Sequence, residues 1–254
     1  MRFLILIPLV ALVAIANGQN DTSSEESRIV GGYQANIEDI SYQAALVTNW
    51  NSVFCGGSII SEKWIVTAAH CVPGRHPMNM RVRVGSSTFA SGGQLLEVVR
   101  IIAHPNYNPR TIDFDIAVIE VSPMTLDNTV GIVRLPNVGE APSQGTVVLA
   151  SGWGHEQSGG VSPSHVRAVS LQISARFFCR LRYPNLTRNM ICARTAGRDT
   201  CQNDSGGPLV VTTSRTLVGI TSFGRGCATP GYPGVYVNVA NANMRHFIST
   251  HTGL

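Results

Sequence analysis

The sequence predicts an all-β protein, a sandwich or a barrel, with one helix near its C-terminal end. Short segments rich in β-branched residues recur along the chain, as is typical of strands. Gly and Pro separate these segments, and many short strands with frequent turns are characteristic of sandwiches and barrels. Hydrophobic residues make up 44% of the 254 residues and charged residues 13%, so a globular fold with a sizeable core is expected.

The expected elements follow from local patterns, taken in chain order. The segment Arg81-Val82-Arg83-Val84 alternates between charged and apolar residues, as a half-buried strand does. Examples of segments with a strand pattern are residues 64–67, 81–84, 95–102, 116–121, 146–149, 217–221 and 235–239. Residues 241–250 are the only stretch expected to be helical, because Met244, Phe247 and Ile248 recur at helical spacing.

The N-terminal end is predicted to be removed in two steps. Residues 1–18 have a positive start and an apolar stretch too short to span a bilayer comfortably, which is typical of a secretory signal peptide. Cleavage after Ala16 and cleavage after Gly18 both fit. Residues 19–28 are polar and acidic, with a basic processing site at Arg28 before the apolar start at Ile29. We therefore expect a secreted, extracellular protein with no membrane segment.

Charge and cysteine content exclude some classes and leave others open. The net charge is +4, and the arginines are scattered, which argues against nucleic-acid binding. Six cysteines in a secreted chain predict disulfides, but six allow fifteen pairings, and spacing alone does not choose among them. The histidines outside residues 67–71 show no metal-ligand spacing and are expected to be ordinary surface or loop residues.

Three separate stretches carry residues suited to nucleophilic catalysis. Ser205 lies in Asp204-Ser205-Gly206-Gly207, where glycines permit a tight, exposed turn. A serine needs a base to take its proton, and His70, at the end of an apolar strand, has an imidazole able to do so. An aspartate leading into an apolar strand can orient that histidine, and Asp115 and Asp113 are the two candidates.

In their order along the chain, these motifs resemble the chymotrypsin-like (trypsin-fold) secreted serine proteases. The resemblance covers residues 29–254. Its motifs are Ile29-Val30-Gly31-Gly32, Cys55-Gly56-Gly57-Ser58, Thr67-Ala68-Ala69-His70-Cys71, Asp115-Ile116-Ala117, Ser151-Gly152-Trp153-Gly154, Asp204-Ser205-Gly206-Gly207-Pro208 and Pro233-Gly234-Val235-Tyr236. It implies one peptidase domain of two antiparallel six-stranded β-barrels with a C-terminal helix. It also implies His70 as general base, Asp115 (which precedes Ile-Ala) as its orienter, and Ser205 as nucleophile.

The resemblance further implies the cross-links and the activation step. The disulfides would be Cys55–Cys71, Cys179–Cys192 and Cys201–Cys227, a three-bridge set like that of invertebrate members, each contributing about 2–4 kcal/mol. The protein would be a zymogen. Cleavage of Arg28–Ile29 would free the Ile29 amino group to pair with Asp204, because a buried carboxylate needs a partner.

Substrate preference is implied by the residues at the pocket positions. Asp199 at the pocket floor would select Arg or Lys before the cleaved bond, because a desolvated cation requires a paired charge. The other implied substrate-binding residues are Thr200, Ser222, Phe223, Gly224 and Gly234, with Tyr183 and Tyr236 shaping the pocket. The expected partners are protein and peptide substrates and protein protease inhibitors, and the expected state is a monomer.

This chain departs from the family pattern at three positions. Phe223 stands where the family usually has Trp, and Arg225 is expected to favour acidic residues upstream of the cleaved bond. Asn203 replaces a glycine whose N–H forms the oxyanion hole with that of Ser205. Either the hole forms normally, which the tolerance of Asn for left-handed backbone favours, or the peptide is flipped and activity is low. The alternatives are therefore a low-activity or non-catalytic binding homologue, or chymotrypsin- or elastase-like specificity, against which Asp199 argues.

No cofactor is expected. Some relatives bind calcium through a loop of the first barrel, but residues 85–93 contain no carboxylate here, and calcium prefers charged oxygen ligands. Asn185-Leu186-Thr187 is a glycosylation sequon, which makes Asn185 a candidate site in the mature protein.

Overall fold

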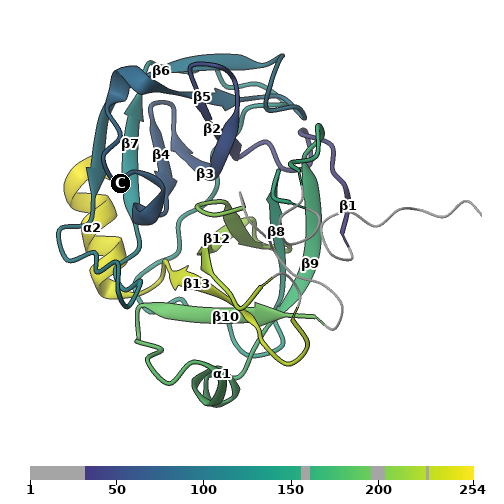
Figure 1. The fold of residues 1–254 in the computed structure, drawn as a ribbon, viewed down its shortest axis with the longest axis vertical. Helices are drawn as coiled ribbons and strands as arrows, with labels where there is room; N and C mark the ends of the chain where they lie inside the picture. The colour runs from purple at the N-terminus through teal and green to yellow at the C-terminus, as the bar shows by residue number, and fades with distance from the viewer. Residues whose placement is uncertain (1–31, 156–160, 196–203, 227–228) are drawn as a thin grey trace, which may run out of the picture.

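The computed structural model describes residues 32–155, 161–195, 204–226 and 229–254 (Figure 1). Within this part of the chain, the strands form two closed six-stranded antiparallel barrels, with a helix at the C-terminal end. This confirms the predicted all-β class and the two-barrel architecture. The predicted strands are present with ends that match or differ by at most three residues, which is the ordinary uncertainty of pattern-based boundaries.

The first barrel pairs its strands in the closed order β2-β3-β4-β7-β6-β5. These are β2 (Gln43–Thr48), β3 (Val53–Ser61), β4 (Trp64–Thr67), β5 (Met80–Val84), β6 (Gln94–Ala103) and β7 (Ala117–Val121). The alternating pattern of β5 placed Arg83 toward solvent, but Arg83 is buried. Its guanidinium instead donates hydrogen bonds to the carbonyls of Phe89 and Gly92, and buried charged groups need such partners.

The second barrel closes in the order β9-β10-β13-β12-β11-β8, with β8 also paired to β9. Its strands are β8 (Val147–Gly152), β9 (Arg167–Ile173), β10 (Met190–Arg194), β11 (Pro208–Val211), β12 (Thr216–Phe223) and β13 (Gly234–Asn238), and the short β1 (Tyr33–Gln34) adds to β9. The barrels touch closely where a Cβ on Gly56 would lie 2.9 Å from Gly207 Cα. Glycine at position 56 therefore permits this close approach of the two backbones.

The C-terminal helix α2 (Ala242–Thr252) lies beside the first barrel (Figure 1). It begins where the Asn241 side chain accepts a hydrogen bond from the N–H of Asn243, and it ends at Gly253, which has a left-handed φ of 77°. Its buried side chains are Met244, Phe247 and Ile248, the stripe that predicted the helix. Among the described residues, no helix is long and apolar enough to cross a membrane.

A second helix, α1 (Arg176–Arg182), projects from the far end of the second barrel (Figure 1). The prediction that only the C-terminal end is helical was therefore wrong. Cys179 is the only buried residue of α1, while Phe177 is 75% and Leu181 62% exposed. Without an apolar face turned to the core, α1 lacks the periodic pattern by which helices are recognised. Short 3₁₀ turns occupy Ala69–Cys71 and Pro77–Asn79.

Candidate active site

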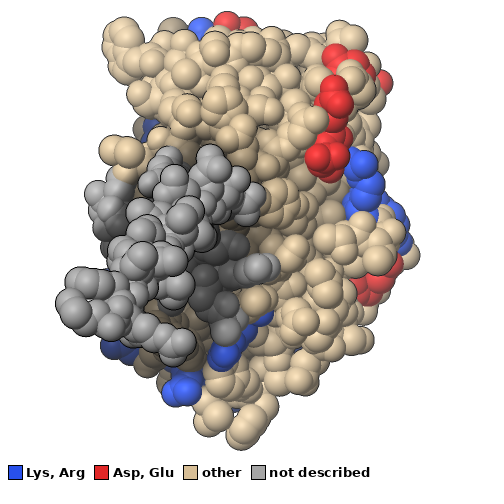
Figure 2. Space-filling model, turned by 90° about the vertical axis from the view of Figure 1, so that its right-hand side faces the viewer, with Lys and Arg blue, Asp and Glu red and all other residues tan. Residues whose placement is uncertain are grey.

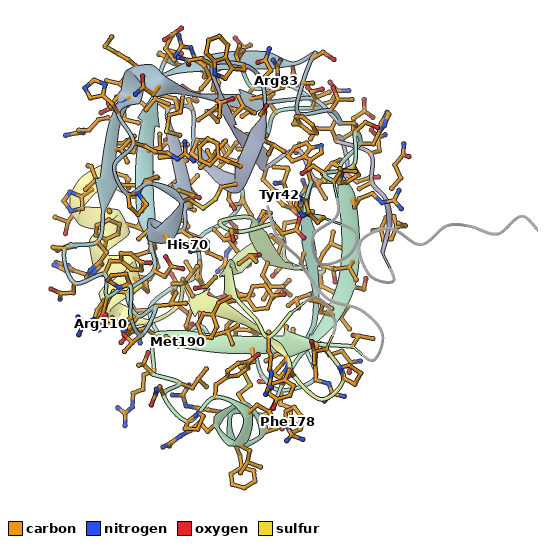
Figure 3. The ribbon with its side chains drawn as sticks, viewed as in Figure 1. Tyr42, His70, Arg83, Arg110, Phe178 and Met190 are labelled. Atoms are coloured by element: carbon orange, nitrogen blue, oxygen red, sulfur yellow. A yellow bond between two sulfur atoms is a disulfide. The ribbon has the colours of Figure 1, made fainter. Side chains whose placement is uncertain are left out.

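His70 and Asp115 are brought together by neighbouring strands of the first barrel. Thr67 at the end of β4 pairs with Ala117 at the start of β7, so the residues that follow β4 and precede β7 meet. His70 Nδ1 lies 2.7 Å from Asp115 Oδ2, and the His70 backbone N–H donates to Asp115 Oδ1 over 2.8 Å. Figure 3 shows His70 at the end of the first barrel that faces the second. This geometry favours the tautomer protonated at Nδ1, which leaves Nε2 as a base.

A serine from the second barrel completes the surroundings of Asp115. The hydroxyl of Ser222, in β12, donates a hydrogen bond of 2.5 Å to Asp115 Oδ2. Asp115 is only 1% exposed, and three donors now face its carboxylate. The sequence assigned Ser222 to substrate binding alone, because nothing in the sequence indicates the direction of this hydroxyl.

The alternative acid, Asp113, has different partners. Its Oδ1 accepts hydrogen bonds of 2.9 Å from Thr187 Oγ1 and from Asn189 Nδ2, both in the second barrel's half of the chain. The same oxygen accepts the backbone N–H of Phe114 over 2.9 Å. Ile112 and Phe114, on either side, have left-handed φ values of 52° and 55°, which are uncommon for such side chains. Asp113 therefore ties a strained loop across the barrels.

The Ser205 turn is fixed against the strand beside His70. The carbonyl of Ser205 accepts a hydrogen bond of 2.8 Å from the N–H of Gly56 in β3. The disulfide Cys55–Cys71 joins that part of β3 to the residue after His70. A His70 ring nitrogen and both sulfurs lie within 4.8 Å of one another. Because the two sulfurs are bonded to each other, this group offers no metal site.

Glycines shape the Ser205 turn itself. Gly206 has a φ of 78°, and its N–H donates to the carbonyl of Thr221 over 2.8 Å. A Cβ at Gly206 would overlap the hydroxyl of Thr67, so both the backbone angle and the space require glycine.

Asp204 is fully buried, with 0% of its surface exposed. Its Oδ1 accepts the backbone N–H of Gly154 over 2.8 Å. A Cβ on Gly152 or on Gly154 would overlap the Asp204 carboxylate. The Ser151-Gly152-Trp153-Gly154 motif thus makes room for this buried acid.

The described substrate-side residues border the end of β12. An added Cβ on Gly224 would lie 3.9 Å from Gly234 Cα, so the two glycines face each other. The Tyr183 ring meets the Phe223 ring edge-on at 5.7 Å, and its hydroxyl donates to the Pro233 carbonyl over 2.9 Å. The disulfide Cys179–Cys192 joins α1 to β10 nearby. Predicted site residues outside the described part of the chain are Arg28, Ile29, Asp199, Thr200, Asn203 and the Cys201–Cys227 pair.

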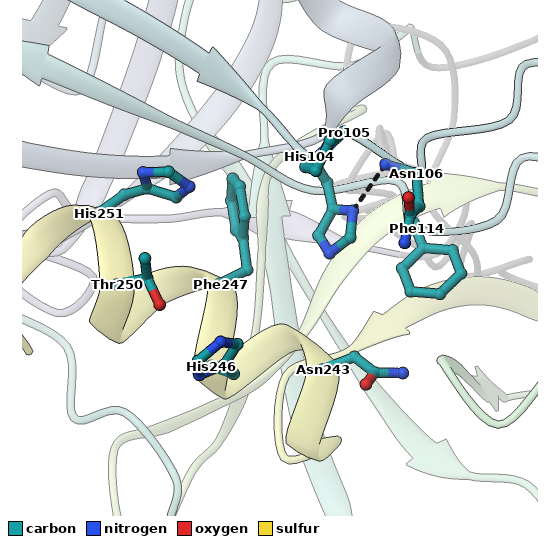
Figure 4. A pocket seen from close by; sticks show the side chains of 9 residues that line it. All are labelled: His104, Pro105, Asn106, Phe114, Asn243, His246, Phe247, Thr250 and His251. Carbon is teal, nitrogen blue, oxygen red and sulfur yellow. Dashed lines mark hydrogen bonds between the residues drawn. The ribbon is translucent and has the colours of Figure 1, made fainter.

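One histidine differs from its expected surface position. His104 is only 9% exposed, and it lines a cavity of about 340 Å³ between the loop after β6 and α2 (Figure 4). Its ring lies 4.7 Å from the Phe114 ring and 4.9 Å from the Phe247 ring. Burial lowers the pKa of His104 below its ordinary value, and the nearby His251 lowers it further. Sequence periodicity did not reveal this packing, because His104 follows the end of a strand.

Two closed barrels that set a histidine, a buried aspartate and a serine turn at their junction define the class of a serine hydrolase with the two-barrel fold. Comparison with known proteins agrees. The trypsin family model matches residues 29–246. Trypsin 5G1 of Aedes aegypti is 40% identical over 233 residues, covering 89% of this chain and 86% of that protein.

Vertebrate trypsins are about equally similar. Trypsin-3 of Salmo salar is 42% identical over 235 residues, covering 89% of this chain and 93% of that protein. Trypsin of Sus scrofa is 40% identical over 227 residues, covering 86% of this chain and 94% of that protein. The chain belongs to the trypsin family and is a serine endopeptidase.

Proposed function

We propose that the chain is a secreted zymogen whose active form cleaves protein and peptide substrates after Arg or Lys. Residues 1–18 act as the signal peptide, residues 19–28 as the activation peptide and residues 29–254 as the peptidase domain, which works as a monomer. The supporting observations are the sequence patterns at the N-terminal end and the membership of the trypsin family. Asn185, exposed on the described surface, is a proposed glycosylation site.

The proposed chemistry rests on one observation, the paired contacts between His70 and Asp115. Ser205 Oγ attacks the substrate carbonyl and gives its proton to His70 Nε2, and Asp115 stabilises the imidazolium that forms. His70 then protonates the leaving amine, which departs and leaves an ester on Ser205. Water, activated by His70, hydrolyses the ester and restores the hydroxyl.

Activation and specificity involve residues inside and outside the described part of the chain. After cleavage at Arg28–Ile29, the new amino group of Ile29 pairs with Asp204, whose burial supports such a role. Asp199 holds the substrate cation, with Thr200 beside it, and Gly224 and Gly234 leave room for the long side chain. The N–H groups of Asn203 and Ser205 bind the developing oxyanion.

One assay tests the proposal. The full chain is expressed, cleaved after Arg28, and given arginyl, phenylalanyl and alanyl chromogenic peptides, with Ser205→Ala as the control. We expect arginyl hydrolysis that needs both the cleavage and Ser205. Preference for phenylalanyl or alanyl peptides would contradict the pocket assignment, and no hydrolysis above the control would leave a binding homologue instead. Asn203→Gly separates the two oxyanion-hole hypotheses, because only a flipped peptide would gain about 10²–10³ in kcat from the glycine.

A further inference from the structure

Three exposed arginines that border the end of β12 form no ion pair with any described acidic residue. We call Arg110, Arg182 and Arg225 the arginine rim; all three are exposed. The four ion pairs among the described residues involve other arginines or His70. Arg180 and Arg188 are also exposed and form none of these pairs, so the rim is distinguished by its position beside Phe223, one of the residues expected to bind substrate.

Two members of the rim share one aromatic ring. The guanidinium carbons of Arg225 and Arg182 lie 4.6 Å and 5.7 Å from the centre of the Tyr232 ring. Arg225 also donates a hydrogen bond of 2.6 Å to the Tyr232 hydroxyl, and its backbone N–H donates to the Tyr183 hydroxyl over 3.3 Å. These contacts hold two positive charges close together, which raises the local positive potential.

A cavity lies between two arginines of the rim and Phe223 at the end of β12. It has a volume of about 230 Å³, and Arg110 and Arg182 form part of its wall. Its apolar wall includes Ile112, Leu186 and Phe223. Phe223 ends β12 and is one of the residues expected to bind substrate. Asn185, the proposed glycosylation site, also lines the cavity. In protein without a glycan at Asn185, the cavity is therefore a place for a substrate side chain, with two cations in its wall.

The charge of the surrounding half of the chain has the same sign. Residues 141–254 contain ten arginines and three acidic residues, Glu156, Asp199 and Asp204, and Asp204 is fully buried. On the face drawn in Figure 2, the described side chains at the lower end of the molecule, where Figure 1 places α1, include basic ones and no acidic ones; Figure 3 places Arg110 on the opposite side. A ligand approaching the rim thus meets a positive field, which accelerates binding of anions.

We propose, resting on the function proposed above, that the arginine rim recognises acidic side chains of protein substrates on the amino-terminal side of the cleaved bond. Arg225, for which the sequence predicts a preference for acidic residues upstream of the cleaved bond, assigns the side. The occupant is a peptide, because the cavity is lined in part by Phe223, an expected substrate-binding residue, and has the size of one or two side chains. The rim thus adds a second preference to that for Arg or Lys at the cleaved bond.

The test compares pairs of fluorogenic peptides that share one arginine at the cleaved bond. One member carries Asp or Glu at the second to fifth positions upstream, and the other carries Asn or Gln. We expect kcat/KM to favour the acidic member by about two- to fivefold for each acid that reaches the rim, the range of exposed ion pairs. Raising salt to 1 M should remove the difference, because it screens exposed charges.

Single changes locate the preference. Arg110→Gln, Arg182→Gln and Arg225→Gln should each reduce the ratio of acidic to neutral kcat/KM, and the triple change should bring it close to one. Arg180→Gln is the matched control, because Arg180 is exposed on α1 but lies outside the cavity. No acidic preference in the wild type, or a preference that survives the triple change, would overturn the proposal.

The same experiments distinguish failure of the proposed function from failure of this inference. If the cleaved enzyme hydrolyses neither peptide of a pair, the function is contradicted, and binding then decides the inference. Fluorescence anisotropy of labelled acidic and neutral peptides with Ser205→Ala protein reports binding without turnover. Tighter binding of the acidic peptide that the triple change abolishes supports the rim, and equal binding of both peptides excludes it.

Discussion

The hydroxyl of Ser222 donates a 2.5 Å hydrogen bond to Asp115 Oδ2, the same oxygen that lies 2.7 Å from His70 Nδ1. Ser222 belongs to the second barrel, whereas His70 and Asp115 belong to the first. One carboxylate oxygen therefore receives a contact from each barrel. Because the carboxylate is buried, a shift between the barrels alters the hydrogen bonds that orient His70.

Removing this hydroxyl gives the first prediction. We expect Ser222→Ala to lower kcat/KM for an arginyl peptide by about 3- to 10-fold. A hydrogen bond to a charged group contributes about 1.5–3 kcal/mol, and the two contacts from His70 remain to hold Asp115. Steady-state kinetics measure the effect. Ser151→Ala is the matched control, because its buried hydroxyl bonds to Gln43 Oε1 instead; equal rates for Ser222→Ala and wild type would refute the contribution.

Asp113 gives the second prediction, through the loop that carries Asp115. Asp113→Ala removes the acceptor for Thr187 and Asn189 and releases Ile112 and Phe114 from left-handed backbone angles. For a short arginyl peptide that does not reach the cavity beside Ile112, we expect kcat to fall with little change in KM, because the position of Asp115 changes and the contacts of this peptide do not. Asp113→Asn keeps one oxygen and should recover most of the rate.

Asp127 supplies the matched control for Asp113. Its Oδ1 also accepts three hydrogen bonds, from the N–H and hydroxyl of Thr129 and the N–H of Val130, but all within its own loop. Asp127→Ala should lower the thermal midpoint without a selective loss of kcat. If Asp113 has a purely structural role, kcat divided by the fraction of folded enzyme should be the same for Asp113→Ala and Asp127→Ala. That result would contradict the prediction.

Asp113 and Asp115 also show how far the sequence predicts the site. The Asp-Ile-Ala motif favoured Asp115, and the contacts of His70 are with Asp115. The residues around Asp113 in the sequence do not reveal its role in holding the loop. Its partners Thr187 and Asn189 lie more than seventy residues away in the sequence. The cross-barrel contacts of Ser222 and Asp113 exist only once both barrels have closed.

The sequence also predicted some elements of the fold and missed others. Strands with β-branched runs were predicted well, because their pattern reflects the pleated backbone directly. The helix α1 was missed, because a disulfide at Cys179 and cation–π contacts to Phe178 hold it rather than an apolar stripe. The burial of Arg83 was missed too, because its partners are loop carbonyls that no periodicity marks.

Gly154 gives the third prediction. In Gly154→Ala, the added methyl group overlaps the Asp204 carboxylate, and backbone and acid must move apart. Overpacking of this kind costs about 1–3 kcal/mol, and displacement of Asp204 also disturbs the Ser205 turn. We expect a lower thermal midpoint and loss of activity after cleavage at Arg28. Gly224→Ala is the control for stability, because its methyl group would meet only ordinary contacts of 3.7 Å and 3.9 Å.

The fourth prediction concerns pH and the cavity around His104 (Figure 4). Burial lowers the pKa of His104, His251 adds to the lowering, and Asp113 opposes it. The N–H of Asn106 donates to His104 Nδ1 over 3.1 Å, a contact that needs the neutral ring. Since the folded pKa lies below the unfolded one, near 6.5, the unfolded chain binds more protons between the two values. The free energy of unfolding therefore decreases as pH falls through that interval.

Thermal midpoints measured from pH 8 to pH 4 test this relationship. His104→Gln removes the titrating group, so the loss of stability below about pH 6.5 should be smaller than in the wild type. Above that pH His104 is neutral in the folded and in the unfolded chain, so its titration does not change the free energy of unfolding with pH. His165→Gln, at an exposed position, is the control and should keep the wild-type slope. If His104→Gln keeps the wild-type slope as well, the acid sensitivity does not come from His104, and the prediction is wrong.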